Sequence, residues 1–176
     1  MAKKQTNGGN GLEHRRAEVQ AIIDSACDQL NSDGVSPRDY VEQLAWLFYL
    51  KAFDEMETQR AVESAFDDTP YTRRLDNEYR WASWSAKVDK ADVMFKFVQT
   101  DLWDKLQGLG DDAIGQRFRR IFSTVRNHSR KGTAFAKVVQ HVNRLDFSAN
   151  TDVIILSELY ESLLKKVAAD SPGYAG

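Results

Sequence analysis

Cysteine is almost absent from this chain of 176 residues. Its single representative, Cys27, cannot form a disulfide within the chain. Because disulfides belong to oxidising compartments, this cysteine usage favours a cytoplasmic protein. Residues 1–11 carry charge but no apolar core, so they are not expected to act as a signal peptide.

Long apolar runs are also lacking, and this bears on both location and fold. No stretch approaches the roughly 18 consecutive apolar residues that a membrane-spanning helix needs, so no membrane partner is expected.

With only three prolines and ten glycines, long stretches are free to be helical. No segment shows the alternation of apolar and polar residues that marks strands between hairpin turns. The sequence therefore predicts an all-α fold, an irregular helical bundle of about five or more helices.

Motifs for catalysis and cofactor binding are missing as well. There is no phosphate-binding loop of the form G-x-x-x-x-G-K-[ST] and no G-x-S-x-G nucleophile. Three dispersed histidines and one cysteine show no zinc-ligand spacing. Residues 108–113 match a loose G-x-G-x-x-A fingerprint, but a helix precedes them where dinucleotide binding needs a strand, so a helix-ending turn is predicted. No catalytic, cofactor-binding or metal-binding residue is predicted, and a stand-alone enzyme such as a small nuclease is the least favoured function.

Apolar residues at helical spacing locate the elements of the bundle. Ser36, Pro37 and Asp39 form a helix start signal, and the helix after them is expected to be the most buried, because apolar residues cover most of its circumference. Residues 67–86 read as a long connection with at most short helices, and residues 150–152 as the cap of the last helix. Residues 1–11 are expected to be disordered. The predicted helices span residues 13–30, 37 to beyond 56, 89–106, 114–122, 132–145 and 153–168.

One basic segment stands out against an overall net charge of -2. Residues 113–131 contain no acid, and a ridge of cations there is suited to contacts with phosphates. The alternative, a solvated face of an amphipathic helix, stays open. The candidate DNA-binding residues of this segment are Arg117, Arg119, Arg120, Arg126, Arg130 and Lys131.

A second group of arginines lies among aromatic residues in the predicted connection. This mixture is typical of nucleic-acid and protein interfaces. Trp81 and Trp84 are three residues apart, so both of them in the core is the alternative. The candidate DNA-binding residues here are Arg73, Arg74 and Arg80, beside Tyr71 and Tyr79.

Several segments together resemble the start of a known family. They are Leu12–Asp28, Tyr40–Lys51, Tyr79-Arg80-Trp81, Leu145-Asp146-Phe147 and Leu156–Leu164. In this order they are similar to the N-terminal helices of type I restriction–modification DNA methyltransferase (modification) subunits. That family usually continues into a Gly-Glu-Phe-Tyr-Thr-Pro segment and a catalytic domain. We therefore expect residues 12–169 to form the helical N-terminal domain of such a subunit, and residues 170–176 to begin the linker to a catalytic domain absent from this sequence.

The resemblance implies a role in N6-adenine methylation of DNA. Full-length members bind S-adenosylmethionine through a Gly-rich loop and methylate a flipped adenine at an Asn-Pro-Pro-aromatic motif. Pro37, Pro70 and Pro172 are isolated, so that motif is absent and this chain alone is expected to be inactive. The implied role of the helical domain is to clamp DNA and to assemble with its own catalytic domain and with specificity and restriction subunits.

A second function stays open beside the DNA clamp. The chain is alternatively a non-catalytic protein-interaction module that docks another subunit through exposed Trp, Tyr and Leu side chains. Docking through the last predicted helix depends on its apolar stripe, Leu156 to Leu164, because a fully buried stripe excludes docking through it.

Overall fold

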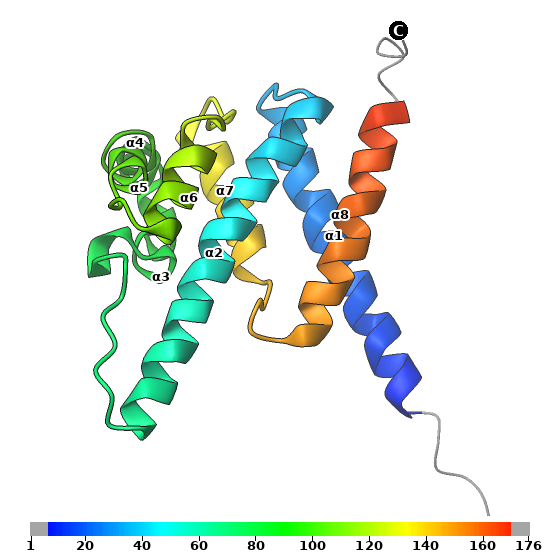
Figure 1. Cartoon of the computed structure of the whole chain (residues 1–176). Coiled ribbons are helices and arrows are strands. Elements are labelled where there is room, and N and C mark those ends of the chain that lie inside the picture. Colours follow the sequence, from blue (N-terminus) through cyan, green and yellow to red (C-terminus); the bar gives the residue numbers. More distant parts are fainter. Residues whose placement is uncertain (1–6, 170–176) are drawn as a thin grey trace, which may run out of the picture.

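The computed structural model describes residues 7–169, and within this range every regular element is helical (Figure 1). The predicted all-α class is therefore confirmed. The two longest helices, α1 (Asn7–Ser32) and α2 (Pro37–Phe66), meet at a short turn and diverge from it. Helix α8 (Asn150–Ala169) packs against both of them, and α7 (Gly132–Asn143) packs on α1 and reaches α2.

The remaining helices are short and form a second group beside α2 (Figure 1). The predicted connection after α2 contains only short helices, as expected. The region predicted as one helix over 89–106 is helical throughout, but it changes type along its length and includes a π-helical turn. The elements are the 3-10 helix η1 (Asn77–Tyr79), α3 (Trp81–Trp84), the 3-10 helix η2 (Ser85–Lys90), α4 (Ala91–Phe97), the π-helix η3 (Val98–Leu102), α5 (Trp103–Gln107) and α6 (Ala113–Phe122).

Two helix starts differ from the sequence prediction. Helix α1 begins at Asn7 rather than near Glu13, so residues 7–11 are helical instead of disordered; adding residues to an existing helix costs far less than nucleating one. Residues 1–6 and the predicted linker at 170–176 lie outside the described residues. Helix α8 already includes residues 150–152, and Asp152 binds a side chain of α1 instead of capping its own helix.

Helix α2 crosses the middle of the molecule and is buried along its first two thirds (Figure 1). Trp46 is 1% exposed and lies between Trp103, at 5.3 Å between ring centroids, and Phe135, at 6.1 Å. Such edge-to-face and stacked pairs add to the hydrophobic burial of the rings. Beyond Glu57 the helix becomes exposed, and Phe66 at its end is 85% exposed.

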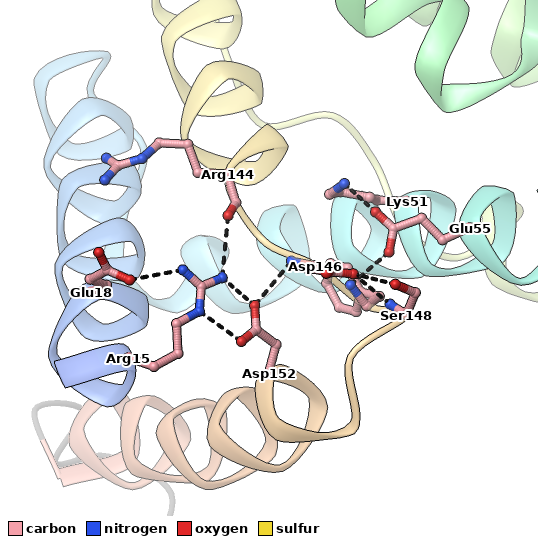
Figure 2. Close-up of polar contacts among 9 residues, drawn as sticks. Arg15, Glu18, Lys51, Glu55, Arg144, Asp146, Ser148 and Asp152 are labelled. Atoms are coloured by element: carbon pink, nitrogen blue, oxygen red, sulfur yellow. Dashed lines mark hydrogen bonds and ion pairs between the residues drawn. The ribbon is translucent and has the colours of Figure 1, made fainter. Parts of the chain in front are cut away.

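A polar network joins α8 to α1 and α2, and Figure 2 shows how its side chains converge. The Arg15 guanidinium of α1 pairs with Asp152 of α8, with Nε donating to Oδ1 at 2.8 Å. Asp152 also accepts the Asp146 amide at 3.1 Å. On the α2 side, Glu55 accepts the Phe147 amide at 2.6 Å and pairs with Lys51. The network therefore fixes the turn between α7 and α8 from two directions.

Candidate nucleic-acid interface

Helix α6 presents opposite faces to the core and to solvent. Asp112 caps it by accepting the Gly115 amide at 3.1 Å, as its position before the first helical residue favours. Phe118 and Phe122 are buried, and Phe118 packs edge-on against Phe53 of α2 at 4.7 Å between centroids. The basic residues therefore lie on the remaining, exposed positions of the helix.

The arginines of α6 fall into two groups by their partners. Arg119 donates to the carbonyls of Gln107 and Gly110 at 3.2 Å each and pairs with Asp111 at 3.0 Å. It ties α6 to the preceding turn. Arg117 and Arg120 are exposed, three residues apart on one face, and within residues 7–169 their side chains make no hydrogen bond or ion pair. Those two guanidiniums are free to meet a ligand.

The segment after α6, residues 123–131, continues the basic surface as a loop. Its backbone amides are held by side chains of α2 and of the α1–α2 turn: Glu42 accepts the Arg126 amide at 2.8 Å, and Asp33 accepts the Arg130 amide at 2.5 Å. The side chains of Arg126, Arg130 and Lys131 are exposed and, in the described part of the chain, unpaired. We call Arg117, Arg120, Arg126, Arg130 and Lys131 the basic row.

The basic row follows the first half of α2. Arg117 lies near Tyr49: burial raises the pKa of the Tyr49 hydroxyl, and the Arg117 charge opposes that rise. The Arg126 backbone sits at Glu42, and the Arg130 guanidinium lies against Gly34, before the start of α2. From Tyr49 to Glu42 alone, a helix rise of 1.5 Å per residue gives about 10 Å. That length corresponds to about three base-pair steps of DNA.

The absence of acids from residues 113–131 is not preserved in space. Glu42 lies 2.8 Å from Nε2 of His128, and Asp39 lies 3.8 Å from its Nδ1. Asp33 accepts the backbone amides of Arg130 and Lys131. These acids come from residues more than eighty positions earlier, and sequence reasoning did not identify them. They bind mainly loop amides and His128, so the cations of the loop stay unneutralised by direct contact.

The second group of arginines is engaged within the molecule. Arg80 Nε pairs with Asp54 at 3.1 Å, and Arg73 donates to the Thr58 hydroxyl at 3.0 Å. Arg74 pairs with Asp112, and this guanidinium lowers the pKa of that carboxyl below its usual range. These contacts fasten the 67–80 connection to α2 and α6. Direct DNA contact by Arg73, Arg74 and Arg80 stays a prediction.

The neighbouring tryptophans belong to the core, the alternative considered for them. Trp81 and Trp84 are 4% and 1% exposed and pack edge-to-face at 4.7 Å between centroids. The Trp81 indole N–H donates to the Asn143 side chain at 2.8 Å. Their rings are therefore not available for stacking on bases.

The stripe on α8 is only partly buried. Leu156 and Leu159 are covered, whereas Leu164 is 43% exposed; outside the stripe, Ile154 of the same helix is 60% exposed. An apolar groove of about 330 Å³ lies between α8 and α2, lined among others by Phe48, Leu156 and Tyr160. Docking through α8 is therefore not excluded.

Neither a cluster of metal ligands nor a membrane-spanning helix is found in the described range. Over residues 7–169, no three His, Cys, Asp or Glu side chains gather as ligands for a metal ion. None of the helices in that range combines the length and apolar character needed to cross a bilayer.

Comparison with known proteins places this helical domain in a family. The family model for the HsdM N-terminal domain matches residues 19–142. The type I restriction enzyme EcoEI methylase subunit of Escherichia coli is 29% identical over 166 residues, which cover 90% of this chain and 33% of that protein. The chain therefore belongs to the HsdM N-terminal domain family, the N-terminal domain of type I restriction–modification methylase subunits.

Solved structures agree with this assignment. A chain from a type I restriction–modification system, studied for its complex assembly and conformational transition, has a TM-score of 0.78 at 30% identity, over 89% of this chain and 31% of that chain. A crystal structure of a modification subunit assigned to a type I restriction enzyme of Vibrio vulnificus YJ016 has a TM-score of 0.77 at 22% identity, over 99% of this chain and 38% of that chain, and shows the same fold. The chain spans about a third of the length of these relatives.

Proposed function

We propose that this domain serves a cytoplasmic type I DNA adenine-N6 methyltransferase by clamping the DNA backbone and by assembling the complex. Its partners are DNA, the catalytic domain of the same subunit, and specificity and restriction subunits. S-adenosylmethionine binds to the catalytic domain and not to this one. The domain contributes no catalytic residue of its own; it holds DNA near the catalytic site without reading sequence, because phosphate contacts position a protein but do not specify bases.

The basic row is the observation that carries the DNA part of this proposal. Its five cations are exposed and lack intramolecular partners in the described range, whereas Arg119, Arg73, Arg74 and Arg80 are all engaged. Unpaired cations along one side of α2 are available to replace counterions on phosphates. If all five contact phosphates, log K falls with log salt concentration with a slope of about -4.5, since each contact contributes about 0.9.

Binding of a fluorescein-labelled duplex of arbitrary sequence, followed by anisotropy over a salt series, tests the proposal. Arg120→Ala is expected to weaken binding and to reduce the slope by about 1. Arg119→Ala is the matched control, since it removes the same charge from the same helix at a position occupied by an internal ion pair. Equal effects of the two substitutions contradict the assignment of the basic row. Arg80→Ala tests the second arginine group in the same assay.

The exposed part of α8 favours a second candidate, a module that only docks other subunits. The groove beside Tyr160 offers an apolar surface on the outside of the domain, and Val153, which is 40% exposed, lines it. Under this alternative the chain shows no DNA binding even at low salt, yet it co-elutes with a separately produced catalytic domain in size-exclusion chromatography. A Val153→Glu substitution in the groove then abolishes co-elution, while Val62→Glu on the exposed end of α2 does not.

A further inference from the structure

We infer that Asp33, Glu42 and Gln43 are positioning residues for the loop of residues 123–131: they hold the loop backbone so that its cations face outward and can contact DNA. This inference rests on the proposed DNA contact of the basic row. These three residues belong to the α1–α2 turn and the first turns of α2, not to the basic segment.

Their hydrogen bonds are directed at one short stretch of backbone. Asp33 Oδ2 accepts the Arg130 amide at 2.5 Å and the Lys131 amide at 3.3 Å. Gln43 Oε1 accepts the His128 amide at 2.6 Å, and Glu42 Oε1 accepts the Arg126 amide at 2.8 Å. Four of the six amides from residue 126 to 131 are thus bound to side chains from a distant part of the chain.

Two of the three residues are buried for this purpose. Gln43 is 0% and Asp33 is 6% exposed, and burying polar side chains is unfavourable unless hydrogen bonds compensate. Gln43 Nε2 and Asp33 Oδ1 have no partner in the described part of the chain. The side-chain hydrogen bonds of Asp33 and Gln43 therefore all go to the loop. No other segment between residues 7 and 169 receives them.

The geometry sets the direction in which the loop side chains point. The amides of residues 126 and 128 face α2 and those of residues 130 and 131 face the α1–α2 turn, while Ser129, between them, is 5% exposed and packed inward. The side chains of Arg126, Arg130 and Lys131 are left on the solvent side. Fixing these long side chains at their base lowers the entropy lost when they meet phosphates.

A positioning role of Asp33 and a purely electrostatic one predict opposite changes in DNA affinity when Asp33 is replaced. Asp33 is an acid that bonds the backbone of two cations, Arg130 and Lys131, so removing its charge alone strengthens binding to DNA. If Asp33 positions the loop, Asp33→Ala instead weakens DNA binding. The slope of log K against log salt then falls by about one to two, because Arg130 and Lys131 lose their fixed backbone and each phosphate contact contributes about 0.9.

The experiment compares variants of the 176-residue chain with the labelled duplex and salt series described above. Asp33→Asn keeps a carbonyl oxygen for the loop amides, so it is expected to bind DNA at least as tightly as the wild type. Asp111→Ala is the matched acid control, since Asp111 pairs with Arg119 and holds no amide of the loop; it is expected not to weaken binding. Circular dichroism and thermal unfolding check that each variant is folded. Glu42→Ala and Glu42→Gln replace the Asp33 pair if Asp33→Ala does not fold.

The outcomes separate this inference from the function on which it rests. Weaker binding with a smaller slope for Asp33→Ala, rescued in Asp33→Asn, supports positioning. Unchanged or tighter binding by a folded Asp33→Ala overturns it, even when Arg120→Ala weakens binding as the proposed function requires. No binding by the wild type at low salt overturns the proposed function and this inference together.

Discussion

Replacement of Arg15 by alanine is a sharp test of how α8 is held to the domain (Figure 2). The Asp152 side chain is 4% exposed, and the substitution removes both of its contacts with the guanidinium. Breaking a fully buried ion pair from one side costs about 3–5 kcal/mol. Arg15 is 30% exposed, and Asp152 keeps the Asp146 amide, so the cost is reduced. We expect a loss of about 2 kcal/mol, in the range for a charged group that loses part of its hydrogen bonding.

Urea denaturation and thermal unfolding measure this loss. A change of about 2 kcal/mol lowers Tm by about 4–8 °C in a domain of this size. Arg16→Ala is the matched control, because Arg16 also links α1 to α8, through Glu158, but its pair is 43% and 50% exposed. An exposed pair contributes about 0–1 kcal/mol. Equal losses in the two variants refute the argument from burial.

The pH dependence gives an independent check of the same pair. Hydrogen bonds from Arg15 lower the pKa of Asp152 below its ordinary value of 3.8. A lowered carboxyl pKa stabilises the fold above the ordinary value, and the stabilisation is lost as pH falls through the folded-state pKa. The difference in unfolding free energy between wild type and Arg15→Ala is therefore expected to shrink below about pH 4. A difference that stays constant to pH 2 contradicts the assignment.

Two further predictions concern other parts of the domain. Burial, and then the charge of Arg144, lower the pKa of His141 from 6.5, so the free energy of unfolding should fall as pH drops below 6.5. The His141→Gln variant should show a smaller fall in the same pH range. An identical pH profile for the variant and the wild type would contradict this effect of His141. A Cβ on Gly115 would lie 2.4 Å from the Gly110 carbonyl oxygen, so Gly115→Ala should cost about 1–3 kcal/mol in urea denaturation. A Cβ on Gly11, in helix α1, would meet no atom within 4 Å, so Gly11→Ala should instead stabilise the fold by up to about 1 kcal/mol. Equal effects of the two substitutions would refute the steric argument.

Helix locations were largely predictable because their signals are local. Pro37 follows the N-cap residue Ser36 as predicted, and the turn at Gly108 ends α5. Even here one detail differs: the Ser36 hydroxyl donates to the Asp39 carboxylate at 2.7 Å and does not bond a helix amide. Helical periodicity reports which face is apolar, but it does not report which polar partner a cap residue selects.

The candidate interface was predictable only in part, because its electrostatics depend on distant residues. The sequence identified the cations from Arg117 to Lys131, and the structure separates Arg119 from the basic row through its contacts with the preceding turn. The amides of residues 126 and 130 meet side chains 84 and 97 positions away. Side chains so far apart in sequence are brought together only by the packing of α1, α2 and α7, which no local pattern contains.

The clamp function depends most directly on where DNA contacts this domain. Amide chemical-shift mapping of the isotope-labelled chain, titrated with a duplex of arbitrary sequence at low salt, locates that contact residue by residue. Our account predicts that the largest shifts occur in α6 and in residues 123–131, and that they diminish as salt is raised. Shifts confined to α8 or to residues 73–80, or no shifts at all, would contradict it.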